Sequence, residues 1–333
     1  MDTNATRKIE PKLIYISSKG LLFQGDSGLL LKDIRSDSID LVFADPPFNL
    51  GKDYKTDSFS DLVAVETYRL WCHLWILELI RVLRPGGSLF LYHLPKWLMD
   101  LGSWMNTLPW LEFRNWIAVK MKSGFPIRGR LHPAHYGILY FTKRGADLTF
   151  HVVRSKTPIC RHCNREIRDY GGYREKYKKY EDEDGVPWIQ VSDFWEDTRP
   201  ASQDKTRDIR IMELPLHIPE RLILMASNPG DTVLDIFGGA GSTYHAAQLN
   251  GRRWIGCEIG DVSPVLSRIK TFFGLEKRSR ISRDLSTHFQ ADFIKKQVAD
   301  YVRDHRTDEF DQISPQKITK SMQRYVSKSR VLD

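Results

Sequence analysis

Residues 232–243 read TVLDIFGGAGST, and this stretch decides the fold. Its apolar start predicts a buried strand and the residues after it predict a helix, so the glycines between them form a strand-to-helix turn. Glycine has no Cβ, which lets the backbone of such a turn approach a ligand closely. The next expected strand, Arg253–Ile259, presents Glu258 near its carboxyl end, where an acid can accept hydrogen bonds from both ribose hydroxyls of a nucleoside.

This glycine turn predicts a cofactor that contains adenosine and lacks a pyrophosphate. The turn is not a P-loop, because no Gly-Lys-Ser/Thr follows, and GGAG departs from the dinucleotide pattern G-x-G-x-x-G. A glycine turn alone can be a purely structural connection. The strand before it, the helix after it and the acid at the proper distance favour the cofactor interpretation.

A second motif, Asp45-Pro46-Pro47-Phe48, follows the expected strand Ile39–Phe43. Ligands of open α/β sheets bind beyond the carboxyl ends of strands. Two prolines fix the backbone and remove two N–H donors, so this corner offers acceptors only. The Asp45 carboxylate and the Pro46 carbonyl could each accept one N–H of an amino group, and Phe48 could stack on a base, worth roughly 1–3 kcal/mol. The structural alternative is a rigid surface turn.

Such a corner suits methylation of an exocyclic amine. The lone pair of this amine is delocalised into the base ring, so the amine is a poor nucleophile. Two acceptors that hold its hydrogens would direct the lone pair at an electrophilic methyl, and the remaining contribution is positioning. A covalent enzyme intermediate is not needed, and no cysteine stands in a Pro-Cys context that would indicate attack on a cytosine ring.

The rest of the chain alternates strand and helix patterns. Residues 66–83 carry apolar side chains at helical spacing, and Arg84-Pro85-Gly86-Gly87 is expected to end that helix. Strands are expected at Ser88–Tyr92 and Gly137–Thr142, and a helix at Pro219–Ser227. The alternation predicts an α/β fold with a mainly parallel sheet and helices on both faces.

Composition suggests three parts. Residues 13–150 and 213–275 form the expected catalytic domain, and 151–212, rich in charge, tyrosine and tryptophan, form an inserted recognition region. That region holds DYGGYREKYKKY, a mixture able to contact phosphates and bases. Residues 276–333 are expected to be a basic, partly helical and loosely attached tail. Cys160 and Cys163 make half a zinc site; we favour reduced thiols and no metal.

The overall charge suits a polyanionic partner. The chain has 333 residues, a formal net charge of +8 and a pI of about 9.2, and lysines and arginines gain affinity for nucleic acid by counterion release. No apolar run is long enough to cross a bilayer, and the N-terminus lacks a signal-peptide pattern. We therefore expect a cytoplasmic protein without a membrane partner.

Together these motifs resemble the DNA amino-methyltransferases, the N6-adenine/N4-cytosine family. The order is the permuted one of the beta class, with ADPPFNLG first, a variable region next and LDIFGGAGST last. LRPGGSLFLY and RRWIGCEI are similar to further family segments. The resemblance implies a Rossmann-like methyltransferase sheet, S-adenosyl-L-methionine as cofactor, and double-stranded DNA from which the substrate base is flipped.

The resemblance also implies roles for individual residues. The catalytic motif maps onto Asp45, Pro46, Pro47 and Phe48. The cofactor site maps onto Asp26, as an adenine contact, and onto Asp235, Phe237, Gly238, Gly239, Gly241, Ser242 and Glu258. The chain departs from the family in two places: Phe48 replaces the commoner tyrosine, and Ile218-Pro219 stands where many members carry Lys-Pro.

Several alternatives stay open at this point. Aspartate at the head of the catalytic motif favours adenine N6, with cytosine N4 as the alternative. RNA or a small amine as substrate is disfavoured by the basic charge and the long inserted region, although the sequence leaves RNA open. A non-enzymatic DNA-binding protein with a decayed site is disfavoured by the intact motifs. A cognate restriction endonuclease and a homodimer are open as partners.

Overall fold

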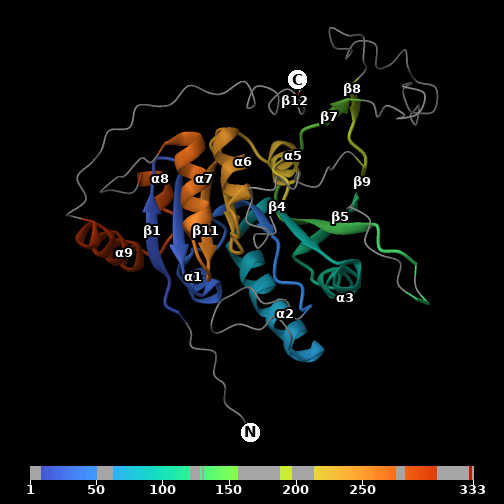
Figure 1. Cartoon of the computed structure of the whole chain (residues 1–333), viewed down its shortest axis with the longest axis horizontal. Coiled ribbons are helices and arrows are strands. Elements are labelled where there is room, and N and C mark those ends of the chain that lie inside the picture. Colours follow the sequence, from blue (N-terminus) through green and yellow to red (C-terminus); the bar gives the residue numbers. More distant parts are fainter. Residues whose placement is uncertain are drawn as a thin grey trace.

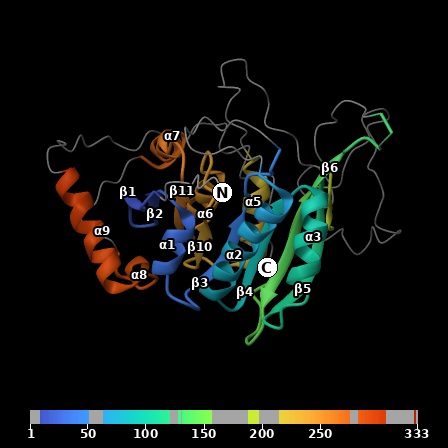
Figure 2. The same cartoon turned by 90° about the horizontal axis from the view of Figure 1, so that it is seen from below.

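The computed structural model describes residues 9–50, 63–120, 128–129, 131–156, 188–196, 214–274, 282–305 and 330–331. A central sheet runs through this part of the chain, with helices on both of its faces (Figures 1 and 2). The α/β fold with a Rossmann-like methyltransferase sheet, as predicted from the sequence, is confirmed.

Within the described residues nine strands form one sheet, in the order β1-β2-β11-β10-β3-β4-β6-β5-β9. The strands β2, β11, β10, β3 and β4 run parallel to one another, and β1 and β6 pair antiparallel at the two ends of that block. The bounds are β1 Lys12–Ile16, β2 Gly20–Gln24, β3 Ile39–Ala44, β4 Leu83–His93, β5 Leu111–Lys120, β6 His135–Lys143, β9 Phe194–Trp195, β10 Thr232–Asp235 and β11 Arg253–Glu258.

The helices divide between the two faces of the sheet, each over its own apolar cluster. Helices α1 (Ser27–Asp33), α2 (Val65–Val82) and α3 (Pro95–Met105) cover one face. Helices α5 (His217–Ala226), α6 (Ser242–Leu249) and α7 (Ser263–Phe273) cover the other, as Figure 2 shows. These two layers bury the parallel strands on both sides, which explains their continuous apolar runs.

The arginine-proline-glycine segment differs from the expectation. Instead of separating helix and strand, it lies inside β4, which begins at Leu83 and pairs there with Ile39. Pairing resumes at Ser88 with Leu41, so residues 84–87 form a bulge in the strand. Gly86 has a φ of +75° within this bulge, a conformation that glycine adopts without strain.

The two sequence motifs follow neighbouring strands. Strand β10, which precedes the glycine turn, pairs in parallel with β3, which precedes Asp45, through Val233–Leu41 and Leu234–Val42. At the opposite end of the two strands, the Asp40 carboxylate accepts a hydrogen bond of 2.8 Å from the Thr232 backbone N–H, across 192 residues of sequence. Parallel strands in register end at one edge, so both motifs lie there.

The chain after α7 is not loosely attached where the structure describes it. Helix α8 (Arg283–Ser286) and its connection to α9 (Ala291–Asp304) add the fully buried Leu285 and Phe289 to the core cluster that α1 and α2 also join. Figure 2 shows α9 beside the edge strand β1. The Gln297 amide donates to the Pro11 carbonyl and accepts from the Leu13 N–H, which covers part of that strand's open edge.

Only parts of the expected recognition region can be placed. Strand β9 joins the main sheet by pairing with β5, and β7 (Val153–Lys156), β8 (Trp188–Gln190) and β12 (Arg330–Val331) form a small separate sheet. DYGGYREKYKKY, Cys160 and Cys163 lie outside the described residues. A search of the described part of the chain finds no helix with the length and apolarity that a membrane crossing requires.

Candidate active site

Aromatic rings surround the Asp-Pro corner after β3. The Phe48 ring stacks on His93 at a centroid distance of 4.8 Å and tilts against Tyr136 at 5.7 Å and Tyr92 at 6.2 Å. Burial, and next the neighbouring Asp45 carboxylate, raise the pKa of the Tyr92 and Tyr136 phenols. The Asp45 carboxylate therefore lies next to an aromatic wall in which a planar base could stack.

Side chains from α2 and α3 hold the backbone of this corner. The Tyr68 hydroxyl donates a hydrogen bond to the Pro47 carbonyl, and the Trp97 indole N–H donates to the Phe48 carbonyl at 3.1 Å. Tyr68 also lies 2.8 Å from His93 Nε2. The two prolines remove N–H groups that could anchor the loop, so the anchoring acts through its carbonyls.

The glycine turn after β10 is shaped by close packing. The Gly238 N–H donates to the Cys257 carbonyl at 2.9 Å, and a Cβ on Gly238 would lie 2.3 Å from the Tyr244 hydroxyl oxygen. Gly239 and Gly241 have φ values of +48° and +76°. No heavy atom lies within 4 Å of where a Gly239 Cβ would stand, so this side of the turn is open.

Two of the predicted cofactor residues support the turn from inside the protein. Asp235 is buried, accepts a hydrogen bond of 2.9 Å from the Phe237 N–H, and has its pKa raised to about 6 by burial. Ser242 is also buried and donates to the Leu214 carbonyl at 2.8 Å. Their side chains fix the shape of the turn.

The Glu258 carboxylate lies directly beside the glycine turn. It accepts hydrogen bonds from the backbone N–H groups of Gly239, at 2.7 Å, and of Gly260, at 2.8 Å. Burial raises the pKa of this carboxyl. The Ile259 backbone also hydrogen-bonds to this carboxylate, and a carboxylate has about four acceptor positions, which leaves capacity for a ribose hydroxyl.

Asp26 belongs to the same edge of the sheet. It caps the N-terminus of α1 by accepting from the Leu29 N–H at 3.2 Å. The residue before it, Gly25, donates its N–H to the Glu258 carbonyl at 3.0 Å. The fold thus brings together the three predicted cofactor segments, at Asp26, at the glycine turn and at Glu258, from parts of the chain far apart in sequence.

Phe237 of the cofactor turn packs against the helix that also holds the Asp-Pro corner. Its ring contacts Trp75 at a centroid distance of 5.2 Å and Trp71 at 5.8 Å, both on α2. Trp71 in turn lies 5.5 Å from the Tyr68 ring, whose hydroxyl holds Pro47. One helix therefore contacts both motifs and fixes their separation.

The arrangement fits an adenosine cofactor. The open side of Gly239 leaves space beside the turn, and Glu258 supplies acceptors for a ribose next to that space. Arg268 of α7 donates to the Ala240 carbonyl at 2.7 Å and so fixes the far end of the turn.

Sequence reasoning missed the residues that support the site: Tyr68, Tyr92, His93, Trp97, Tyr136 and Arg268. One signal was available for His93, because it ends the strand β4, which neighbours β3 in a parallel block. Tyr136 lies at the start of β6. Because β6 runs antiparallel to β4, its first residues lie at this same edge of the sheet.

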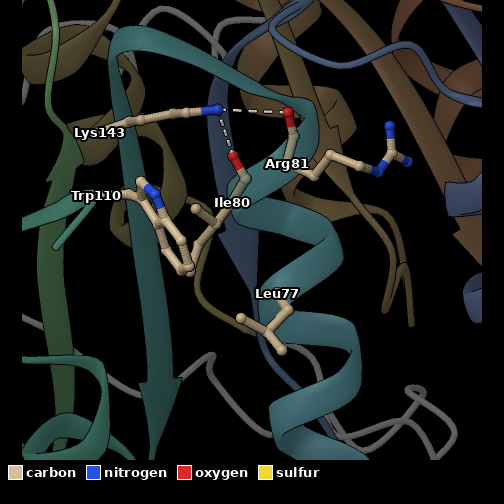
Figure 3. A pocket seen from close by; sticks show the side chains of 5 residues that line it. All are labelled: Leu77, Ile80, Arg81, Trp110 and Lys143. Atoms are coloured by element: carbon tan, nitrogen blue, oxygen red, sulfur yellow. Dashed lines mark hydrogen bonds between the residues drawn. The ribbon is translucent and has the colours of Figure 1, made fainter. Parts of the chain in front are cut away.

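A surface pocket of about 280 Å³ lies at the opposite edge of the sheet, where α2 ends (Figure 3). It is lined by Leu77, Ile80, Arg81, Trp110 and Lys143. The Lys143 ammonium donates to the Ile80 carbonyl at 2.7 Å and to the Leu83 carbonyl at 2.7 Å, which satisfies the end of the helix. This pocket contains no residue of either motif, and its lysine has a structural role.

Comparisons with known proteins agree with this geometry. A family model described as DNA methylase matches residues 39–262. The Type II methyltransferase M.BamHI of Bacillus amyloliquefaciens is 40% identical over 267 residues, which are 80% of this chain and 60% of that relative. The DNA adenine methyltransferase YhdJ of Escherichia coli (strain K12) is 27% identical over 294 residues, covering 83% of this chain and 86% of YhdJ.

A solved structure also shares the fold. The PvuII DNA methyltransferase, described as cytosine-N4-specific, superposes with a TM-score of 0.52 at 17% identity and covers 89% of this chain and 96% of its own. At this identity the likeness concerns the fold alone. The family model spans both motifs and the segment between them, in the permuted order. The chain therefore belongs to the DNA methylase family, the N6/N4 class of S-adenosylmethionine-dependent DNA methyltransferases that its sequence predicted.

Proposed function

We propose that the chain transfers the methyl group of S-adenosylmethionine to the exocyclic amine of a base flipped out of double-stranded DNA. The observation that carries this proposal is the pairing of β3 with β10, because it sets the acceptor-only corner at Asp45 next to the glycine turn. Family membership supplies the reaction class, and the basic charge suits the DNA.

The chain's own residues act on the amine. The Asp45 carboxylate and the Pro46 carbonyl each accept one of its hydrogens, which keeps the lone pair available and aimed at the cofactor. Phe48, with Tyr92 and Tyr136, provides the apolar wall for the ring, and stacking of this kind is worth about 1–3 kcal/mol. Asp45 can then receive the proton that the nitrogen must lose after methylation.

The bound cofactor supplies an electrophilic methyl on a sulfonium. Glu258 would hold its ribose, the turn at Gly238 and Gly239 would line the cofactor site, and Asp26 would contact the adenine, as the family resemblance implies. Phe237 packs against the tryptophans of α2 and so links the cofactor turn to the helix that holds the Asp-Pro corner. Most of the catalytic effect then comes from holding two reactants in line.

Adenine N6 remains our predicted acceptor, with cytosine N4 as the alternative. The relatives do not separate them, because one is named an adenine methyltransferase and one similar fold is named cytosine-N4-specific. A recognition role for residues 151–212, a cognate restriction endonuclease, a homodimer and a cytoplasmic location also belong to the proposal.

The test incubates the purified chain and tritiated S-adenosylmethionine with unmethylated genomic DNA, with duplex RNA, or with no acceptor. We expect label in DNA, abolished by Asp45→Ala and retained in Asp292→Ala, which removes an exposed carboxylate on α9. Label only in RNA, or cofactor binding without transfer, would contradict the proposal. Nucleoside analysis of the labelled DNA then distinguishes N6-methyladenine from N4-methylcytosine.

A further inference from the structure

We propose that Tyr68 and His93 are positioning residues, which fix the catalytic corner through a directed chain of hydrogen bonds that ends at the Pro47 carbonyl. The chain runs from the Leu94 backbone N–H to His93, from His93 to Tyr68, and from Tyr68 to Pro47. The inference rests on the proposed function, because it concerns how the corner is held for reaction.

The direction of the chain follows from its Pro47 end. A carbonyl oxygen can only accept, so the single hydroxyl proton of Tyr68 is committed to Pro47. The Tyr68 oxygen, 2.8 Å from His93 Nε2, must then accept from that nitrogen. The proton of the imidazole is therefore on Nε2.

The other end of the chain requires the same tautomer independently. The Leu94 backbone N–H can only donate, and it lies 2.8 Å from His93 Nδ1, which must be the unprotonated nitrogen. His93 is fully buried, and burial lowers its pKa to about 3, so the ring is neutral at physiological pH. A neutral imidazole with its proton on Nε2 satisfies every group in the chain.

The Asp-Pro-Pro corner needs this kind of support. Pro46 and Pro47 have no backbone N–H, so this part of the chain cannot donate hydrogen bonds to a neighbouring strand. The donors come instead from side chains, Tyr68 at the Pro47 carbonyl and Trp97 at the Phe48 carbonyl. With these two carbonyls held, the Pro46 carbonyl between Asp45 and Pro47 has a fixed direction.

His93 has a second contact with the corner. Its ring stacks on Phe48 at 4.8 Å with an interplanar angle of 23°, so the residue that orients Tyr68 also supports the aromatic ring proposed to stack on the base. The Cys72 thiol, one helical turn along α2, also hydrogen-bonds to the Tyr68 side chain. Loss of the Tyr68 hydroxyl should loosen the Pro47 carbonyl, and with it the direction of the Pro46 carbonyl, without removing a hydrogen bond to the cofactor turn.

The kinetic test compares Tyr68→Phe with Tyr140→Phe. Tyr140 is a matched control, a buried tyrosine of the same sheet whose hydroxyl lies 3.3 Å from Ser88 Oγ, away from the corner. We expect Tyr68→Phe to lower kcat about 10–100-fold with KM for S-adenosylmethionine changed by less than about twofold. Tyr140→Phe should keep wild-type kcat, with a similar change in melting temperature. Equal kcat in the two variants would overturn the inference and leave the proposed function intact.

A second measurement does not depend on activity. Nitrogen-15 NMR of histidine side chains identifies the protonated nitrogen, and His93→Gln assigns the His93 signals among the ten histidines. We expect His93 to be neutral with its proton on Nε2 at pH 7, and its Nε2 signal to shift in Tyr68→Phe. A proton on Nδ1, or a charged ring, would refute the chain of hydrogen bonds even if no nucleic acid is methylated.

Discussion

Replacement of Asp235 by asparagine should stabilise the protein at neutral pH. The Asp235 side chain is 3% exposed, and burial raises its pKa from 3.8 to about 6. Its hydrogen bonds with the Phe237 N–H and the Thr243 side chain offset only part of this desolvation, and the nearby Glu258 carboxylate adds to the increase. The surroundings of the Asp235 carboxyl therefore disfavour its ionised form.

The sign of the effect follows from proton linkage. The folded-state pKa of Asp235 lies above the unfolded value, so between pH 3.8 and 6 the folded chain binds more protons than the unfolded chain. The free energy of unfolding therefore falls as pH rises through this window, and the penalty is complete above it. A difference of about two pKa units corresponds to about 3 kcal/mol at pH 8, and to little at pH 4.

Asparagine retains an oxygen for the Phe237 N–H and carries no charge. We expect Asp235→Asn to raise the free energy of unfolding by up to about 3 kcal/mol at pH 8, a gain of about 5 °C in melting temperature, with almost no gain at pH 4. Urea titrations at both pH values measure the difference. A variant no more stable than wild type at pH 8, or equally stabilised at both, would refute the reasoning.

Asp261→Asn is the control of opposite sign. Asp261 is exposed, and its hydrogen bonds with the Ser263 hydroxyl and backbone N–H lower its pKa. Its contribution to stability is present above the unfolded pKa and is lost as pH falls, so its replacement should destabilise the protein at pH 8 and matter less at low pH.

Three further substitutions test the site and the fold. Glu258→Ala should weaken S-adenosylmethionine binding about 10–100-fold in calorimetry, because it removes a charged acceptor of the ribose, and unchanged affinity would exclude this residue from the cofactor site. Gly238→Ala should lower the melting temperature, since its Cβ would lie 2.3 Å from the Tyr244 hydroxyl, and adding Tyr244→Phe should restore part of the loss; a tolerated alanine would contradict this packing. Phe289→Ala should cost about 3–5 kcal/mol in urea titrations, whereas a loss below about 1 kcal/mol would mean that α8 and α9 are not part of the cooperative core.

The features predicted well from the sequence depend on local pattern and on one rule of sheet geometry. Apolar runs located β3 and β10, and the rule that ligands bind at the carboxyl ends of parallel strands predicted that Asp45 and the glycine turn would meet. Glu258 was found because its distance from the turn is set by one helix and one strand. These predictions needed no knowledge of which helix covers which face.

The features that were missed depend on tertiary packing. Tyr68 lies in the first turn of an amphipathic helix and looks like any other core aromatic until α2 is placed against the Asp-Pro corner. The attachment of α9 rests on the buried Ile294 and Tyr301 and on the partly buried Phe293, and the strand that α9 contacts lies at the other end of the chain. Local patterns do not encode such partners.

The hydrogen bond between Asp40 and Thr232 closes a loop of 192 residues at the centre of the sheet. The entropy of closing a flexible loop grows only with the logarithm of its length, so doubling the length of a surface connection inside this segment would cost about 0.6 kcal/mol. The segment also holds α2, β4, β6 and α5, whose buried residues form much of the core, so this tolerance applies to connections between those elements and not to the elements themselves.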